Sequence, residues 1–205
     1  MKKILFSLLA FLGLISFNSC NNYTPEEKEY INSIEENRNV VDEWMKDNQN
    51  SPFNYKGKVE YSGLKYFDVD PDFVFKSKFI EYDEKVDIPI LGTKGEKRAA
   101  LRIGYLSFNK DNKDYKLNVY ANMGQDSSVY YSIWFTDKTT SRQTYGVGRY
   151  LSFELDPNKD HIYTIDFNLA FNPYCAYNAN YSCAIPSQDD YLDLAVTAGE
   201  KIYHD

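Results

Sequence analysis

Residues 101–121 read LRIGYLSFNKDNKDYKLNVYA, and this stretch decides the fold. The polar cluster at 109–112 has the composition of a turn, because Asn and Asp stabilise loops by bonding to their own backbone. Apolar side chains alternate with other residues on both sides of it, at Leu101, Ile103 and Tyr105 and again at Tyr115, Leu117 and Val119. A period of two residues is typical of half-buried strands. The stretch therefore predicts a β-hairpin made of residues 101–108 and 115–121.

The same period recurs on either side of the hairpin. Further strands are expected at residues 73–79, 86–90, 129–135, 145–151, 162–167 and 192–196. Pro89 makes residues 86–90 an edge strand, because proline cannot donate a hydrogen bond to a ladder. No helix-length pattern alternates with these strands, which argues against a βαβ sheet. The pattern predicts a mainly β fold, an antiparallel β-barrel or sandwich with one N-terminal helix.

That helix is expected to begin after Thr24. The run Thr24-Pro25-Glu26-Glu27 combines a capping residue, a proline at the first helical position and the glutamate of a capping box. Apolar residues then form one face as far as about Lys46, at Tyr30, Ile31, Ile34, Val41, Trp44 and Met45. Ser51-Pro52 prevents further helix. We expect the helix to pack over a sheet edge or barrel mouth; a partner-binding helix is the alternative.

The N-terminus has the pattern of a secretory signal peptide. Two lysines precede the apolar stretch 4–17, which is shorter than the roughly 20 residues that span a bilayer. Cys20 follows after Asn18 and Ser19 and resembles the acylated cysteine of bacterial lipoproteins; an unlipidated secretory signal is the alternative. The sequence predicts a signal at 1–19, a lipidated tether at 20–24 and a single β-rich domain at 25–205. The expected location is the cell envelope, with the protein held on a membrane by lipid and facing periplasm or cell surface.

The composition excludes one class of partner. Removal of Lys2 and Lys3 with the signal takes the formal net charge from −7 to −9. Nucleic-acid binding rewards clustered Lys and Arg, so no nucleic-acid partner is expected. The 19 Tyr and 13 Phe residues predict a β-rich core, with exposed tyrosines that stack on a ligand as the alternative.

The last third resembles a family of uncharacterised bacterial and archaeal proteins, a domain of unknown function. The blocks that carry the resemblance are TYGVGRYL at 144–151, DFNLAFNPYCAY at 166–177, CAIP at 183–186 and AGEK at 198–201. Relatives usually read C-P-x-P-P-x-E-N after the second cysteine. This chain departs at four of those positions, with Ala184, Ser187, Asp189 and Asp190. The resemblance implies where a site lies but no activity.

Cys175 and Cys183 lie in one loop of that region, and no other cysteine follows Cys20. Disulfides persist in the expected compartment, so we expect these two to be joined. A zinc half-site with His161 or His204 is disfavoured by the ligand spacing, and no metal or cofactor is expected. A nucleophilic Cys175 would need a base; no histidine is near it in sequence, and an approach of His161 in space stays open.

The candidate ligand-binding residues are Arg149, Asp166, Asn168, Asn172 and Glu200. Arg149 shares an alternating face with Tyr145, Val147 and Leu151, which predicts that it points inward. A buried arginine needs a partner, and Asp166 and Glu200 are the candidates. Loop scaffolding is the alternative role for the aspartate and asparagines.

No motif names a reaction, so whether the protein is an enzyme stays open. The leading hypothesis is a lipid-anchored envelope module that binds a small ligand or a protein partner. The first alternative is an envelope hydrolase or transferase that uses Asp166 or Cys175. The second alternative is a structural or assembly lipoprotein.

Overall fold

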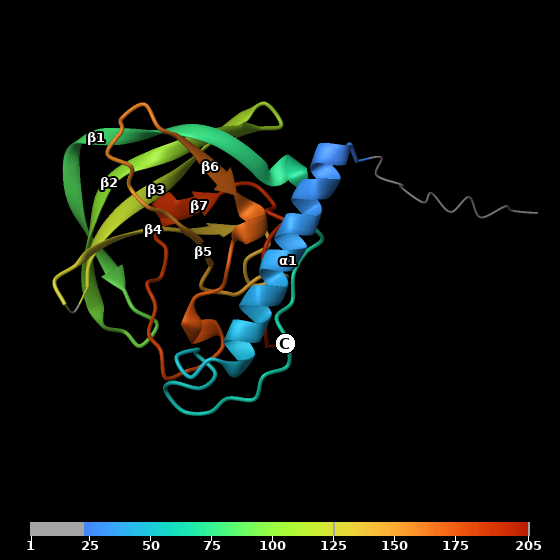
Figure 1. Cartoon of the computed structure of the whole chain (residues 1–205). Helices are drawn as coiled ribbons and strands as arrows, with labels where there is room; N and C mark the ends of the chain where they lie inside the picture. Colours follow the sequence, from blue (N-terminus) through green and yellow to red (C-terminus); the bar gives the residue numbers. More distant parts are fainter. Residues whose placement is uncertain (1–22, 125, 205) are drawn as a thin grey trace, which may run out of the picture.

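The computed structural model describes residues 23–124 and 126–204, which fold around one curved sheet that forms half a barrel (Figure 1). The signal segment and Cys20 lie outside the described residues. The sheet order is β5-β4-β3-β2-β1-β6, with all these neighbours antiparallel, and β7 pairs with β4 in parallel. The strands are β1 (Val74–Leu91), β2 (Lys97–Lys110), β3 (Lys113–Met123), β4 (Val129–Asp137), β5 (Arg149–Ser152), β6 (Ile162–Asp166) and β7 (Tyr191–Leu192). The predicted mainly β, antiparallel architecture with a helix near the N-terminus is confirmed.

The hairpin from which the prediction started is β2–β3. Its register pairs Phe108 with Tyr115 and Lys110 with Lys113, so only two residues make the turn. Those residues, Asp111 and Asn112, have φ angles of 53° and 59°. A two-residue turn with positive φ at both positions matches the right-handed twist of the strands, and Asp and Asn tolerate that conformation better than other side chains.

Two expected strands, at 73–79 and 86–90, form the single long strand β1. Its register with β2 shifts between Glu81 and Val86, so residues 82–85 are absorbed as an irregularity instead of a turn. The first five residues of β1 pair with β6 and the rest pair with β2, which curls the sheet. The backbones approach closely there: a Cβ on Gly104 would lie 2.4 Å from the Ile80 carbonyl oxygen. Pro89 lies in the half with one strand neighbour, as expected for an edge.

Two strands are shorter than the alternation suggested. Residues 145–148 form a turn before β5, in which the Gly148 N–H donates to the Tyr145 carbonyl at 2.9 Å and Gly148 has a φ of 99°. A ladder that includes 145–148 was therefore a wrong prediction. The expected strand at 192–196 keeps its alternating burial, but only Tyr191 and Leu192 pair as β7. The alternation in this segment shows which side chains are buried. The Leu194 carbonyl accepts from the Lys138 N–H just beyond β4, and the Val196 carbonyl accepts from the Arg149 side chain.

The helix α1 (Pro25–Asp47) runs along one side of the half-barrel, and the C-terminal third of the chain lies between the two (Figure 1). The predicted capping box is present: the Thr24 hydroxyl accepts from the Glu27 N–H, and the Glu27 carboxylate accepts from the Thr24 N–H. Near its end, Met45 packs with Phe53, Tyr177 and Tyr203. The described part of the chain contains no helix with both the length and the apolar character to cross a bilayer.

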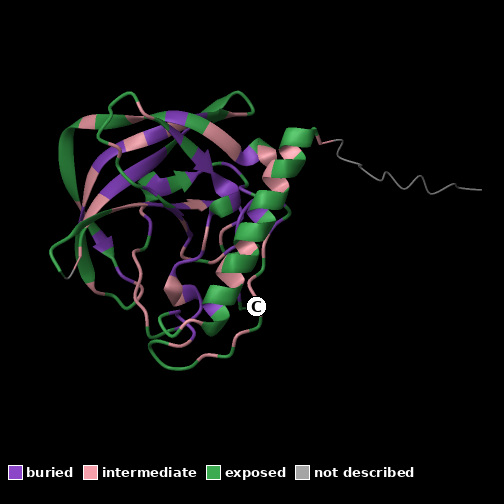
Figure 2. Cartoon of the chain, viewed as in Figure 1, coloured by how far each residue is buried: buried purple, intermediate pink, exposed green. Residues whose placement is uncertain are grey.

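The main core fills the concave side of the sheet (Figure 2). Phe167 lies at its centre with no exposed surface, and its ring is 5.3 to 6.4 Å from four others, those of Phe73, Phe75, Phe108 and Phe135. Perpendicular aromatic contacts at such distances add to the free energy of burial. The aromatic residues around Phe167 therefore form part of a β-rich core, as the composition predicted.

A smaller core on the other face is built around Tyr120 and Trp134, whose rings stack at 4.3 Å. The buried carboxylate of Asp190 ties this face together. Its Oδ1 accepts from Tyr120 and Asn118, and its Oδ2 accepts from Trp134 and from both the N–H and the hydroxyl of Ser187. A carboxylate that is bonded by this many donors can be buried without a cation.

This geometry explains why Ser187 and Asp190 depart together from the pattern that the sequence resembles. A proline at 187 supplies neither the N–H nor the hydroxyl that Asp190 Oδ2 accepts. An asparagine at 190 would place its NH₂ group against the donors of either Oδ1 or Oδ2, so the five donors present here favour an aspartate. With proline at 187, the two donors from Ser187 are absent, and this preference for aspartate at 190 is weaker.

We predict that Ser187→Pro and Asp190→Asn each lower the free energy of unfolding by about 1–3 kcal/mol, because each leaves buried donors or acceptors unmade. Ser187 has a φ of −78°, which proline can adopt. In the double variant the losses should fall short of additivity by about 0.5 kcal/mol or more, measured by urea unfolding. Asp189→Asn, next in sequence and largely exposed, is the control. Strict additivity of the two losses would contradict the explanation.

Candidate functional site

Arg149 on β5 points inward as predicted and is 1% exposed. Its partner is Asp137 at the end of β4, not Asp166 or Glu200: Nη2 lies 2.8 Å from Asp137 Oδ2. Nη2 also donates to the Val196 carbonyl at 2.8 Å, and Nη1 donates to the carbonyls of Ala198 and Glu200. The expectation of an ion pair with Asp166 or Glu200 is therefore corrected. Arg149 neutralises a carboxylate that emerges from the neighbouring strand, and both terminal nitrogens are occupied by protein.

Asp166 and Asn168 connect β6 to α1. Both oxygens of Asp166 accept from the Tyr30 hydroxyl, at 2.9 and 2.8 Å, and Oδ1 also accepts from the Asn168 N–H at 2.9 Å. The Asn168 amide donates to the Tyr30 hydroxyl and to the Asp70 carbonyl, and its oxygen accepts from the Asp70 N–H. These bonds pin the first half of α1. Burial and, next, the Asp166 carboxylate raise the pKa of Tyr30, while the hydrogen bond from Asn168 lowers it.

Glu200 and Asn172 meet at the other end of the site. Glu200 is 2% exposed, and its Oε2 accepts from the Asn172 N–H at 2.9 Å and from the Tyr177 hydroxyl. Burial raises the pKa of Glu200 to about 7, although the two hydrogen bonds and, more weakly, Arg149 and Arg38 act in the opposite direction. Asn172 donates to the Lys201 carbonyl and is buried, and its Oδ1 accepts no hydrogen bond from the described residues.

Cys175 and Cys183 are free thiols in this structure, so the expected disulfide is corrected. The loop still brings them together, because the Cys175 N–H lies 3.3 Å from Cys183 Sγ. Hydrogen bonding from the Cys183 thiol, helped by the Tyr145 hydroxyl, lowers the pKa of Cys175 to about 7. His161 bonds to Asp156 at 3.2 Å, so the histidine that a nucleophilic Cys175 was expected to use is engaged on its own loop.

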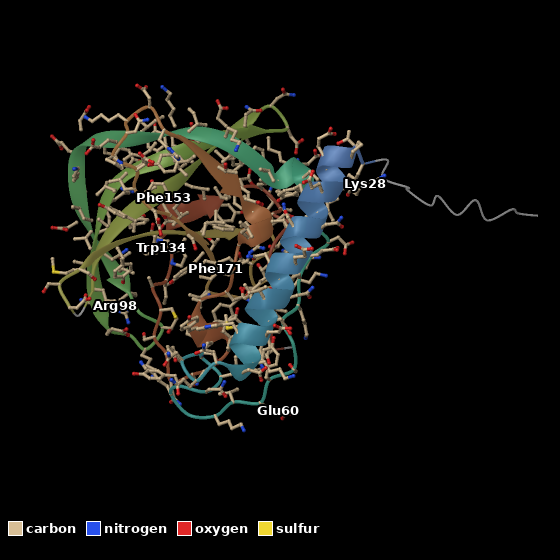
Figure 3. All side chains as sticks on the ribbon, in the orientation of Figure 1. Lys28, Glu60, Arg98, Trp134, Phe153 and Phe171 are labelled. Carbon is tan, nitrogen blue, oxygen red and sulfur yellow. The ribbon has the colours of Figure 1, made fainter. Side chains whose placement is uncertain are left out.

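A cleft of 460 Å³ lies where the middle of α1 faces the half-barrel. We call it the α1 cleft. Its apolar wall comes from the sheet and the following loop, with Leu106, Ile133, Leu151, Phe153, Tyr163, Ile165, Ala170, Phe171 and Tyr174. Phe153 and Phe171 are labelled in Figure 3. Val41 and Met45 add apolar surface from α1. The cleft has the apolar lining and few polar groups of a small-molecule site.

Three of the five predicted site residues line the α1 cleft: Asp166, Asn168 and Glu200. Arg149 and Asn172 do not line the cleft. They contact Glu200 instead, Arg149 at its backbone carbonyl and the Asn172 N–H at its carboxylate. The sequence prediction missed Arg38 and Tyr66, which supply further polar groups. Arg38 could have been found, because Ile34, Arg38, Val41 and Met45 recur at helical spacing and place a charge on the apolar face.

The Arg38 side chain is held in place by an aromatic ring and two backbone carbonyls. Its guanidinium carbon lies 4.5 Å from the centre of the Tyr66 ring. Nη1 donates to the Phe67 carbonyl at 2.9 Å, and Nη2 lies 3.4 Å from the Asn168 carbonyl. Its Nε is covered and has no acceptor among the described residues. The guanidinium therefore holds the loop before β1 against α1 as well as facing the cleft.

The comparisons with known proteins bear on this region. The family model described as protein of unknown function (DUF1684) matches residues 59–201. The chain belongs to this family. The family match includes Arg149, Asp166 and Glu200 and begins after α1.

One solved structure similar to this chain is an uncharacterised protein from Haloarcula marismortui, determined in solution by NMR. It is 29% identical, with a TM-score of 0.61, over 87% of this chain and 98% of that chain. The comparison with curated proteins finds no match. The family and the similar structure therefore support the fold and carry no stated activity.

We predict that Arg149→Met lowers the free energy of unfolding by about 3–5 kcal/mol, because Asp137 would keep a buried charge without its partner. Urea unfolding measures the loss. Arg142→Met, at an exposed arginine in the preceding turn, is the matched control. The double variant Arg149→Met with Asp137→Asn should recover part of the loss, since the orphaned charge is then removed. A loss of unfolding free energy below about 1 kcal/mol is what a surface ion pair contributes, and it would contradict the role given to the buried Arg149–Asp137 pair.

Proposed function

We propose that the protein is a lipid-anchored cell-envelope module that binds a small molecule with an apolar body in the α1 cleft. The observation that carries this proposal is the cleft itself. A cavity of 460 Å³ lies beside a well-packed core and is lined by apolar surface with a few charged groups at its ends. Protein interiors close up around apolar side chains unless something else occupies the space. A cleft of this size and lining therefore favours a ligand.

The arrangement of α1 supports the same function. The helix is fixed near its start by Tyr30 and near its end by Met45, while residues 37–41 between these points border the cleft. Because α1 is held at both ends, the side of the cleft that it forms keeps its shape when the cleft is empty. Such preorganisation reduces the free energy that ordering costs on binding.

The enzymatic alternative has less support. Asp166 is engaged by the Tyr30 hydroxyl and an N–H, and His161 contacts Asp156 instead. A general base needs a lone pair within reach of the substrate proton, and a substrate would have to compete for Asp166 with the Tyr30 hydroxyl and the Asn168 N–H. Cys175 has a lowered pKa but does not line the α1 cleft. The structural or assembly alternative expects a filled interior, and the cleft argues against it.

The envelope location rests on the sequence of residues 1–20. We predict that the mature chain begins at an acylated Cys20, seen by mass spectrometry, and that the full-length protein sediments with membranes. Cys20→Ser should release it to the soluble fraction, because acyl chains supply the membrane affinity. Ser19→Ala, which keeps a small residue before the cleavage point, is the control and should stay lipidated. An unmodified mature chain would contradict the proposed lipid anchor and would not affect the proposal that the α1 cleft binds a ligand.

The binding proposal is tested by filling the cleft from the helix. We predict that the neutral dye N-phenyl-1-naphthylamine fluoresces on binding the wild-type protein, and that Val41→Trp lowers its affinity about tenfold or more by occupying apolar volume. Val40→Trp is the matched control, since Val40 is the neighbouring residue and is 65% exposed. Equal dye binding by both tryptophan variants, or none by the wild type, would contradict a ligand site in the α1 cleft.

A further inference from the structure

The charges that line the α1 cleft are unbalanced. Among the described residues around it, Glu154, Asp166 and Glu200 are carboxylates and Arg38 is the single cation. Arg38 already donates to two backbone carbonyls and packs on Tyr66. Five aromatic side chains share the lining: Tyr66, Phe153, Tyr163, Phe171 and Tyr174. Carboxylates beside aromatic faces favour an organic cation, because both attract positive charge.

Hydrogen bonding singles out one oxygen of this set. Both donors to the Glu200 carboxylate, the Asn172 N–H and the Tyr177 hydroxyl, bond to Oε2. Oε1 accepts no hydrogen bond from any residue of the described chain, and it is not among the fully covered polar atoms without a partner. Asp166, in contrast, accepts hydrogen bonds on both oxygens. Glu154, the third carboxylate of the lining, is exposed, so the buried carboxylate oxygen without a bonded donor is Glu200 Oε1.

The alternative ligand class is an anion bound by Arg38, and the surroundings of Arg38 disfavour it. Both terminal nitrogens of Arg38 are directed at carbonyls, and its Nε has no partner but is covered by protein. Each terminal nitrogen of Arg38 keeps a second N–H, but an anion placed there would face the three carboxylates of the same lining. A cation can pair with Glu200 Oε1, which has no bonded donor to lose.

We infer that the α1 cleft takes an amphiphilic organic ammonium ion, whose N–H donates to Glu200 Oε1 while its apolar body lies against the aromatic wall. This inference rests on the proposed function and names the ligand class for that site. Arg149 and Asn172, which do not line the cleft, act as positioning residues: Arg149 bonds to the Glu200 carbonyl, and the Asn172 N–H fixes the carboxylate. Loss of either contact would move the acceptor.

The protonation of Glu200 should also make the affinity of the site depend on pH. Burial raises the pKa of Glu200 to about 7 in the empty protein. The groups that face it are Tyr177, the Asn172 N–H, Tyr66, Arg38 and Arg149, and none offers it a direct salt bridge among the described residues. A bound ammonium favours the carboxylate, so binding releases a proton. Affinity for an ammonium ion should therefore rise from about pH 6 to about pH 8 and then level off.

The test uses three probes of one shape: 4-phenylbutylamine, 4-phenylbutanol and 4-phenylbutyric acid. Their affinities for the full chain are measured by calorimetry and by displacement of the neutral dye. We expect the amine to bind at least about tenfold more tightly than the alcohol, which a hydrogen bond to a charged group supplies, and the acid to bind most weakly. Glu200→Gln should remove the preference for the amine over the alcohol. Glu36→Gln, at an exposed glutamate of α1, is the matched control.

Two results would overturn the inference alone. The acid could bind as tightly as the amine, or the amine and alcohol could bind equally while both displace the dye; the ligand site would then stand without its preference for cations. Failure of all three probes and of the dye would remove the proposed function as well. If Glu200→Gln does not fold, the wild-type pH series decides, and an amine affinity that is constant across the range overturns the inference.

Discussion

The buried ion pair between Arg149 and Asp137 is the interaction on which the rest of the structure depends. The segment 193–200 follows a strand of only two residues, so most of its carbonyls have no ladder to accept from. Arg149 donates to three of them while its charge is matched by Asp137. A buried arginine without these acceptors would be too costly, and the carbonyls without the arginine would be unsatisfied. The pair thus replaces a strand partner and delivers Glu200 to the cleft in a fixed position.

The α1 cleft exists because the helix is fixed at its two ends by different chemistry. Tyr30 joins the polar cluster of Asp166 and Asn168, and Met45 enters an aromatic cluster with Phe53 and Tyr177. Between these points the helix presents Arg38 and Val41 to the half-barrel without closing onto it. The open side of a half-barrel leaves apolar strand residues that a closed barrel would cover with its own chain. In this fold the helix and the C-terminal third provide that cover and leave the cleft.

The sequence supports the fold well and the site in part. Alternation at 101–121 predicted the central hairpin, and the capping box predicted the helix start, because both signals are local. The same alternation misled at 192–196, where Leu192, Leu194 and Val196 are buried in the main core although only Leu192 of this run pairs with a strand. Asp137 has two roles: its Oδ1 accepts from the Thr139 N–H in the turn after β4, and its Oδ2 pairs with Arg149. Sequence spacing cannot show that second role, since it depends on how β4 and β5 are paired.

The position of Glu200 shows why the site needs parts from the whole chain. Its carbonyl is held by Arg149 from β5, and its carboxylate by Asn172 and Tyr177 from the loop that follows β6. Held in this way, the side chain cannot turn toward bulk water when the cleft is empty. Burial is then compensated by uptake of a proton near neutral pH and not by a change of rotamer. A carboxyl group that is fixed, buried and half-titrated is costly to maintain for stability alone, and a cationic occupant of the cleft would relieve that cost.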